Sequence, residues 1–143
     1  MRIRRRLGFT AALAAMAASA GLLATAAPAS AGPNCASGYH CVFYLGINDS
    51  ARHSYFNSDS NFAGDTFNQL TTRSGGGQGV NDNTVSASNS STGGYESHYY
   101  VNSGYSGFLF CVNPGSYVDY LPGSQQNTAS SLQLRGTTSI SCY

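Results

Sequence analysis

Apolar and polar residues alternate over short runs of this chain, and glycine-containing turns separate the runs. Within residues 107–112, Phe108 and Phe110 would lie on one face of a strand, and Leu109 and Cys111 on the other. Similar runs predict strands at residues 40–45, 97–101, 107–112, 117–121, 130–134 and 138–142. Because no stretch after residue 31 keeps a 3.6-residue apolar period, the pattern predicts an all-β protein.

Turn signals stand between these runs, at residues 75–77, 92–94, 114–115 and 122–123. Many short strands with such punctuation are typical of a β-sandwich or a barrel. All ten tyrosines and six of the seven phenylalanines follow residue 31. Since each aromatic ring can bury a large apolar area, we expect one folded domain rather than a disordered chain.

Residues 1–31 have the pattern of a secretory signal peptide. Four arginines within the first six residues precede an apolar, alanine-rich run over 7–27, and Ala29-Ser30-Ala31 is a small-x-small cleavage site. The alternative is a transmembrane anchor, but polar residues and Pro28 interrupt the apolar run. We therefore expect cleavage, and a secreted domain over residues 32–143.

The charge after residue 31 is negative and sparse. Three arginines and no lysine stand against five aspartates and one glutamate, so the formal charge is −3. Three dispersed cations cannot neutralise a run of phosphates or an anionic membrane surface. We expect no nucleic-acid partner, no membrane partner after cleavage, and a monomer.

Four cysteines follow the signal segment and predict two disulfides, because export places them in an oxidising compartment. They are Cys35, Cys41, Cys111 and Cys142. Three pairings are open, and the short spacing of the first two favours a local loop, which leaves the last two to pair with each other. A zinc site that adds His40 and His98 is the alternative, but the chain has no Cys-x-x-Cys motif and no close histidine pair.

The chain also contains an internal repeat. Residues 81–86 (Asn-Asp-Asn-Thr-Val-Ser) align with residues 126–131 (Gln-Asn-Thr-Ala-Ser-Ser) at a distance of 45 residues. An aromatic corner, Tyr100-x4-Tyr105-x-Gly107, precedes the second hexad. Two units of this size indicate a duplicated four-strand motif.

The first half offers two registers for the same corner. One register begins at Tyr44, and the other uses Phe62-x-Gly64. We favour the second, because Gly64 lies 17 residues before its hexad and Gly107 lies 19 residues before the other.

An aromatic corner followed by an Asn/Asp-rich hexad resembles the βγ-crystallin pattern. The signal peptide, the cysteine pair ahead of Val42-Phe43-Tyr44, the stretch 79–83 and the run Cys111-Val112-x-Pro114-Gly115 resemble the actinobacterial βγ-crystallin-like peptidase inhibitor family, of the metalloproteinase-inhibitor type. The resemblance covers nearly all of residues 35–134. It implies two Greek-key motifs in a βγ-crystallin-like β-sandwich with two disulfides.

The resemblance also implies a secreted inhibitor of an extracellular peptidase, of the thermolysin-like metallopeptidase class. Its reactive bond would be Cys111–Val112, with Val112 as the apolar residue after the bond and Pro114 helping to hold the segment rigid. The alternative is that Cys111 and Val112 are core residues of a strand. A rival exposed segment is 71–74, where Arg73 would suit a trypsin-like pocket, although the glycine run beside it predicts a flexible loop.

In the resembled fold, the hexads supply oxygen ligands to Ca²⁺. The candidate ligands here are Asp82, Asn127 and Ser130. Val85 and Gln126 depart from the pattern, so any calcium binding is expected to be weak, and no other cofactor is expected. The favoured alternative is that Ser86 and Ser131 only hydrogen-bond the turns that close each Greek key.

No catalytic motif supports an enzyme. The chain lacks a Gly-x-Ser-x-Gly elbow, a His-Glu-x-x-His helix and a phosphate-binding loop, and Glu96 is its one glutamate. We expect His53 and His98 to be surface or strand residues rather than catalytic bases. Two function classes remain: a peptidase inhibitor, and a non-inhibitory extracellular βγ-crystallin-like module with a calcium-binding, cell-surface or antimicrobial role.

Overall fold

A computed structural model describes residues 31–143, so most of the predicted signal peptide lies outside the described residues. The described chain consists of seven strands and one short 3-10 helix, η1 (Phe62–Gly64). The strands are β1 (His40–Phe43), β2 (Arg52–Tyr55), β3 (Ser86–Asn89), β4 (Glu96–Asn102), β5 (Ser106–Val112), β6 (Tyr117–Val118) and β7 (Ser131–Arg135). Within residues 31–143, no helix has the length and apolarity that a membrane crossing requires.

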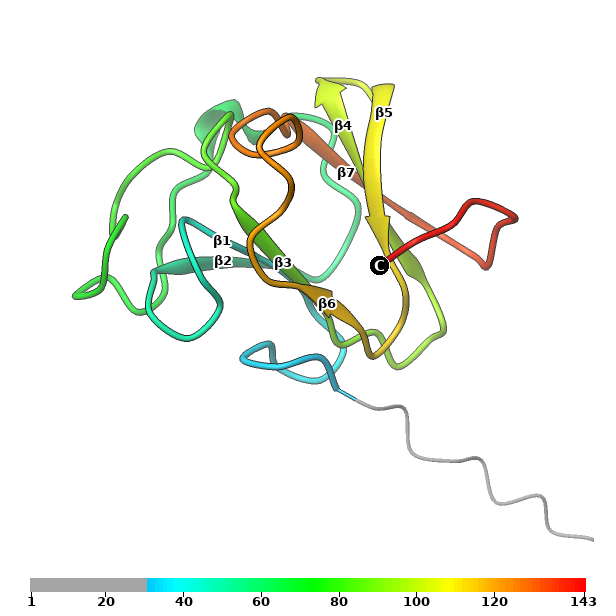
Figure 1. Cartoon of the computed structure of the whole chain (residues 1–143), viewed down its shortest axis with the longest axis horizontal. Coiled ribbons are helices and arrows are strands. Elements are labelled where there is room, and N and C mark those ends of the chain that lie inside the picture. Colours follow the sequence, from blue (N-terminus) through cyan, green and yellow to red (C-terminus); the bar gives the residue numbers. More distant parts are fainter. Residues whose placement is uncertain (1–30) are drawn as a thin grey trace, which may run out of the picture.

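The strands form two antiparallel sheets, with orders β2-β1-β3-β6 and β5-β4-β7 (Figure 1). β6, which belongs to the second half of the chain, pairs with β3 in the sheet of the first half. In return, Asp59 of the first half bridges to Leu132 of β7 through two backbone hydrogen bonds of 2.8 Å. Each half therefore has one segment in the other half's sheet, which confirms the prediction of two Greek keys in a βγ-crystallin-like sandwich.

The core fills the space between the sheets. Val42 and Ala87 come from the first sheet, and Tyr99, Phe110 and Leu132 from the second; all five are buried. The rings of Tyr99 and Phe110 stack at 4.5 Å between centroids. Burial of these large apolar surfaces is the main stabilising contribution to the fold.

Both disulfides have the predicted pairing. Cys35 is bonded to Cys41, which ties the N-terminal segment to β1, and Cys111 is bonded to Cys142, which ties the C-terminal tail to β5. All the cysteines of the described chain are therefore paired. Two disulfides are compatible with the predicted export, and secretion itself stays a prediction.

The regular alternation predicted for residues 107–112 is wrong at one position. A β-bulge pairs Tyr99 with Phe110 but Tyr100 with Phe108, so Leu109 has no direct partner. The bulge turns Phe108 to the outer face, where it is 45% exposed, while Phe110 remains in the core at 3%. Phe108 packs there against His98, at 5.6 Å between ring centroids.

The strand predicted for residues 138–142 is not formed. Thr138 bends back to donate two hydrogen bonds to Glu96, through its backbone N–H and its hydroxyl. Only the last residue pairs with β5: the Tyr143 N–H donates to the Cys111 carbonyl at 2.9 Å. Side-chain contacts and a disulfide, rather than a ladder, hold this tail.

The favoured corner register is also wrong. The hairpin of β1 and β2 occupies the place in the first half that the hairpin of β4 and β5 occupies in the second. The corner of the first half therefore lies in the β1–β2 hairpin, where Phe43 pairs with Ser86 as Tyr100 pairs with Ser131, and not at Phe62. Phe62 lies in η1, where its fully buried ring stacks on Tyr55 at 4.9 Å, so its aromatic character serves the core.

Candidate functional site

An open groove with a volume of about 430 Å³ lies where both sheets contribute residues. It is formed by the start of β1, the segment after β2, the link between β3 and β4, and β7. Its lining residues are Gly38, His40, Phe56, Asn57, Ser58, Ser91, Thr92, Gly93, Tyr95 and Leu134. The volume is in the range of small-molecule sites in proteins.

Two aromatic rings in the groove are unusually exposed. Phe56 is 61% exposed and Tyr95 is 49% exposed, although rings of this size are usually mostly buried. Phe56 leans on Tyr39, at 5.4 Å between ring centroids. A Cβ atom on Gly93 would lie 2.7 Å from the Tyr95 ring, so any larger residue at position 93 would require that ring to move.

The link that carries Tyr95 is fixed by hydrogen bonds. The Ser91 N–H donates to Asn89 Oδ1 at 2.9 Å, and the Tyr95 N–H donates to Ser91 Oγ at 3.0 Å. Asn89 Nδ2 in turn donates to the carbonyls of Tyr95 and Val112, both at 2.9 Å. The backbone that presents Tyr95 is therefore preorganised, which lowers the entropic cost of binding.

The groove carries no formal charge at neutral pH. Of its ten lining residues, none is an aspartate, glutamate, lysine or arginine. His40 is buried in its floor, with Nδ1 2.6 Å from Ser97 Oγ across the two sheets. Burial lowers the pKa of His40 to about 4, so its imidazole is neutral at pH 7.

This buried histidine makes stability depend on pH. Unfolding returns the pKa of His40 from about 4 to its ordinary 6.5, so the unfolded state binds more protons between these values. The free energy of unfolding should be highest above pH 6.5 and fall by about 3 kcal/mol as the pH drops to 4. Urea denaturation across this range should show the slope in the wild type and a much weaker one in His40→Gln. Equal slopes would contradict the assignment.

The calcium candidates are divided between two half-sites. Asp82 and Ser130 lie together, with Oδ1 3.3 Å from Oγ. Asn127 occupies the equivalent position in the second hexad, where its N–H donates to the Thr84 carbonyl and Val85 offers no side-chain oxygen. Of the three predicted ligands, Asp82 and Ser130 are in direct contact, and Asn127 belongs to the other hexad. The pair around Asp82 fits part of the oxygen set that Ca²⁺ requires, and the other half-site fits less well.

Both hexad serines make the turn hydrogen bonds that the alternative predicted. Ser86 Oγ accepts from the Tyr120 N–H at 2.9 Å. Ser131 Oγ donates to the Asn102 carbonyl at 2.7 Å and accepts from the Tyr105 N–H at 3.3 Å. Both serines thus fix neighbouring turns.

The asymmetry of the half-sites predicts a gain of function. Val85→Thr adds a hydroxyl of nearly the same shape at the position equivalent to Ser130, so it should increase the stabilisation by calcium. In the wild type, calcium at a concentration equal to its Kd would stabilise the fold by only about 0.4 kcal/mol. Ser130→Val should remove that effect. Melting curves with and without calcium measure this, and identical responses of the three proteins would contradict it.

The predicted reactive bond Cys111–Val112 is buried in this structure, and its role in inhibition stays a prediction. Cys111 is 1% exposed and Val112 is fully buried, and both are paired within β5, with His98 and Ser97 as partners. Both residues lie at the C-terminal end of the edge strand β5, and their burial leaves no exposed substrate-like segment there. The alternative reading, that these are core residues, is the one the structure supports.

The rival segment around Arg73 is exposed but not loose. A Cβ on Gly75 would lie 2.0 Å from Tyr44 Cγ, so that glycine permits close packing rather than flexibility. The Ser74 carbonyl accepts from the Ala51 N–H at 2.9 Å, and the Arg73 N–H donates to the Leu70 carbonyl, which closes a turn. The expectation of a floppy loop is therefore wrong.

The three histidines lie in different surroundings. His53 lies in β2 with Nδ1 2.7 Å from the Thr66 carbonyl, and His98 is buried in β4. The alternative zinc site would combine the cysteines with His40 and His98. It is not formed in this structure, because His40 faces Ser97 and each cysteine is in a disulfide.

The His98 side chain has a carboxylate partner. Its Nε2 lies 2.7 Å from Glu96 Oε2. Burial opposes ionisation of Glu96, but the hydrogen bonds from His98 and Thr138 hold the pKa of its carboxyl below the ordinary value.

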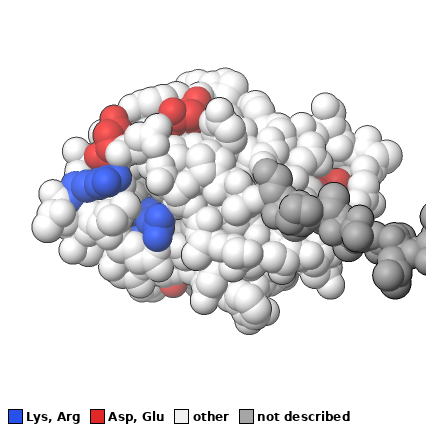
Figure 2. Space-filling view, turned by 90° about the horizontal axis from the view of Figure 1, so that it is seen from below, with Lys and Arg blue, Asp and Glu red and all other residues white. Residues whose placement is uncertain are grey.

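Phe56 and Tyr95 were not among the residues predicted for a site. A usable signal was present: each stands beside a turn cluster, Asn57-Ser58 or Gly93-Gly94, rather than inside an alternating run. Figure 2 shows one face of the molecule, formed mostly by uncharged residues, with its basic groups toward one side.

No family model matches this chain, and no curated protein matches it. Among solved structures, the N-terminal domain of protein S is similar to it, with a TM-score of 0.48 and 18% sequence identity. That similarity covers 68% of this chain and 96% of the other. The two-Greek-key assignment rests on the strand order and the interlocking bridge described above, and membership in the inhibitor family stays a prediction.

Proposed function

We propose that this chain is a non-enzymatic extracellular recognition module that binds a neutral carbohydrate in the groove. The observation that carries the proposal is the pair of exposed rings, Phe56 and Tyr95, in a concave site without a charged side chain. This function belongs to the second of the two predicted classes, the non-inhibitory module with a cell-surface role.

The chemistry of the lining matches a sugar ring. A pyranose has apolar C–H faces and a rim of hydroxyl groups. The faces of Phe56 and Tyr95 can cover the C–H faces, since aromatic rings supply large, rigid contact area. Asn57, Ser58 and Thr92 supply donors and acceptors for the rim. Because a buried hydroxyl without a partner costs free energy, these polar side chains are as necessary as the rings.

Two other ligand classes fit less well. An anionic glycan or a phosphate needs cations, and none of the groove residues is one. A peptidase held by a substrate-like segment needs an exposed bond, whereas Cys111–Val112 is buried. The inhibitor function therefore has no support from the position of its predicted reactive bond.

The test is binding to insoluble polysaccharides, measured as depletion of the protein from solution. Neutral polymers (cellulose, chitin and a β-1,3-glucan) are compared with the anionic polymers pectin and alginate. We expect retention on at least one neutral polymer, followed by calorimetry with its soluble oligosaccharide. Phe56→Ala and Tyr95→Ala should each weaken binding roughly tenfold, which corresponds to about 1.4 kcal/mol.

Phe108→Ala and Tyr117→Ala are matched controls, because these rings are 45% and 52% exposed but do not line the groove. They should bind as the wild type does. Equal losses in the groove and control variants, retention on anionic polymers alone, or no retention at all would overturn the proposal. A parallel assay against thermolysin-like and trypsin-like peptidases tests the inhibitor class directly.

A further inference from the structure

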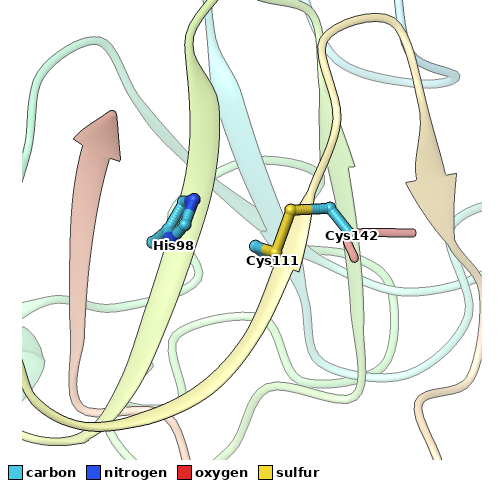
Figure 3. A group of neighbouring side chains, drawn as sticks. All are labelled: His98, Cys111 and Cys142. Carbon is cyan, nitrogen blue, oxygen red and sulfur yellow. A yellow bond between two sulfur atoms is a disulfide. The ribbon is translucent and has the colours of Figure 1, made fainter. Parts of the chain in front are cut away.

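A second cluster, which shares no residue with the groove, lies on the outer face of the β5-β4-β7 sheet (Figure 3). It consists of His98 on β4 and the disulfide between Cys111 of β5 and Cys142 of the tail. One ring nitrogen of His98 and the two sulfur atoms all lie within 4.8 Å of one another. His98 and Cys111 are direct cross-strand partners, so the sheet itself sets their spacing.

The imidazole of His98 has an unused nitrogen. The Glu96 carboxylate holds Nε2 at 2.7 Å, which makes Nε2 the protonated nitrogen and leaves a lone pair on Nδ1. Nδ1 is buried and has no hydrogen-bond partner within residues 31–143. A carboxylate that orients a histidine in this way is the usual outer partner of a metal-bound imidazole.

We propose that reduction of the Cys111–Cys142 disulfide creates a site for a thiophilic metal ion such as Zn²⁺, with His98, Cys111 and Cys142 as its ligands. Two thiolates and one imidazole form a typical ligand set for this ion, with a fourth position open to water. The intact disulfide blocks the site, because its sulfurs have no thiolate charge to offer. Metal binding is then controlled by redox state.

The chemistry balances with a dithiol as the reductant. The dithiol is oxidised to its own disulfide and passes two electrons and two protons to the Cys111–Cys142 bond, which becomes two thiols. When the metal binds, both thiols release their protons to solvent. Oxidation reverses the sequence and expels the ion.

Contacts other than the disulfide keep the ligands together after reduction. The Tyr143 N–H donates to the Cys111 carbonyl, and the Asn113 N–H donates to the Tyr143 carbonyl, both at 2.9 Å. Tyr143 Oη donates to Gln125 Oε1 at 2.8 Å. These hydrogen bonds hold the tail at the C-terminal end of β5, so Cys142 remains beside Cys111.

The structure also leaves room for the change. In a tetrahedral zinc site the ligand atoms are about 3.5–3.8 Å apart, so the sulfurs must separate by roughly 2 Å from their bonded distance. A cavity of about 210 Å³ borders the disulfide, lined among others by Phe110, Gln125 and Tyr143. Because both cysteines line it, this cavity gives their sulfurs room to separate.

The test uses Co²⁺ as a spectroscopic substitute for Zn²⁺, added under inert gas after reduction by a phosphine that does not itself bind through sulfur. The protein carries Cys35→Ser and Cys41→Ser, so that only the second cysteine pair remains. We expect one Co²⁺ per chain with a thiolate-to-cobalt charge-transfer band, and no such band before reduction. His98→Gln should weaken binding at least tenfold, while far-ultraviolet circular dichroism reports whether the fold persists.

The matched control keeps Cys35 and Cys41 and carries Cys111→Ser with Cys142→Ser. It should show no thiolate-to-cobalt charge-transfer band after reduction. A band of equal strength in this control, an unchanged affinity in His98→Gln, or unfolding of the reduced protein would each overturn the proposal. Loss of carbohydrate binding alone would not affect it, because the two sites share no residue.

Discussion

Removing the Cys111–Cys142 disulfide by a double change to alanine is expected to lower the free energy of unfolding by about 3.7 kcal/mol, whereas removing Cys35–Cys41 should cost about 2.4 kcal/mol. The difference follows from loop length, because the two bridges span 31 and 6 residues of sequence separation. A longer closed loop removes more conformational freedom from the unfolded chain. Urea denaturation of the two double variants measures both losses.

The shorter bridge is the control for the longer one. A larger loss on removal of Cys35–Cys41 would contradict the account and show that the N-terminal segment contributes more than its loop length implies. Since a domain of this size is commonly stable by 5–15 kcal/mol, the variant without the long bridge should still fold. The redox-controlled metal site requires this result.

Phe62→Ala is expected to lower the free energy of unfolding by about 3–5 kcal/mol. The Phe62 ring is fully buried in η1 and stacks on Tyr55, so its removal leaves a cavity that the surrounding sheets cannot close completely. Phe56→Ala makes the same chemical change six residues earlier, where the ring is 61% exposed, and should cost less than about 0.5 kcal/mol.

Chemical denaturation of the two variants separates packing from recognition. Similar losses for both would contradict the assignment of Phe56 to a binding surface and would make it a structural residue. A small loss in the free energy of unfolding would also make Phe56→Ala a valid variant for the carbohydrate assay, because the variant would then lose affinity without losing its fold.

The sequence predicted the fold class well because strong local signals carry it. Alternating aromatic and β-branched residues mark the strands near 40–43 and 96–112, and cysteine spacing predicted both disulfides. The repeated hexads predicted the duplication that the interlocked sheets display. These signals depend on neighbours in the sequence or on simple counting.

The missed strands lack such signals. β3 (Ser86–Asn89) contains two serines and an asparagine, yet all four of its residues are buried in the middle of a sheet. Its polar side chains have hydrogen-bond partners outside the strand, as when Asn89 Nδ2 donates to the carbonyls of Tyr95 and Val112. β2 (Arg52–Tyr55) is also largely polar and pairs along its whole length with β1. Tertiary pairing overrides local preference in both cases.

The candidate sites were hardest to predict, because each is assembled from segments far apart in the chain. Phe56 and Tyr95 share one groove although 39 positions separate them, and their surroundings decide that the rings face solvent. Conversely, the Cys111–Val112 motif predicted an exposed reactive bond, whereas the structure buries both residues. A motif reports residue types, and accessibility depends on the whole fold.

The measurement that tests the recognition account most directly is a nuclear magnetic resonance titration of the isotopically labelled protein with the oligosaccharide of the polymer that retains it. The account predicts that the backbone amide shifts cluster at residues 56–58 and 91–95, around Phe56 and Tyr95. Shifts centred on residues 71–74 or 111–115, or no shifts at a saturating concentration, would contradict it.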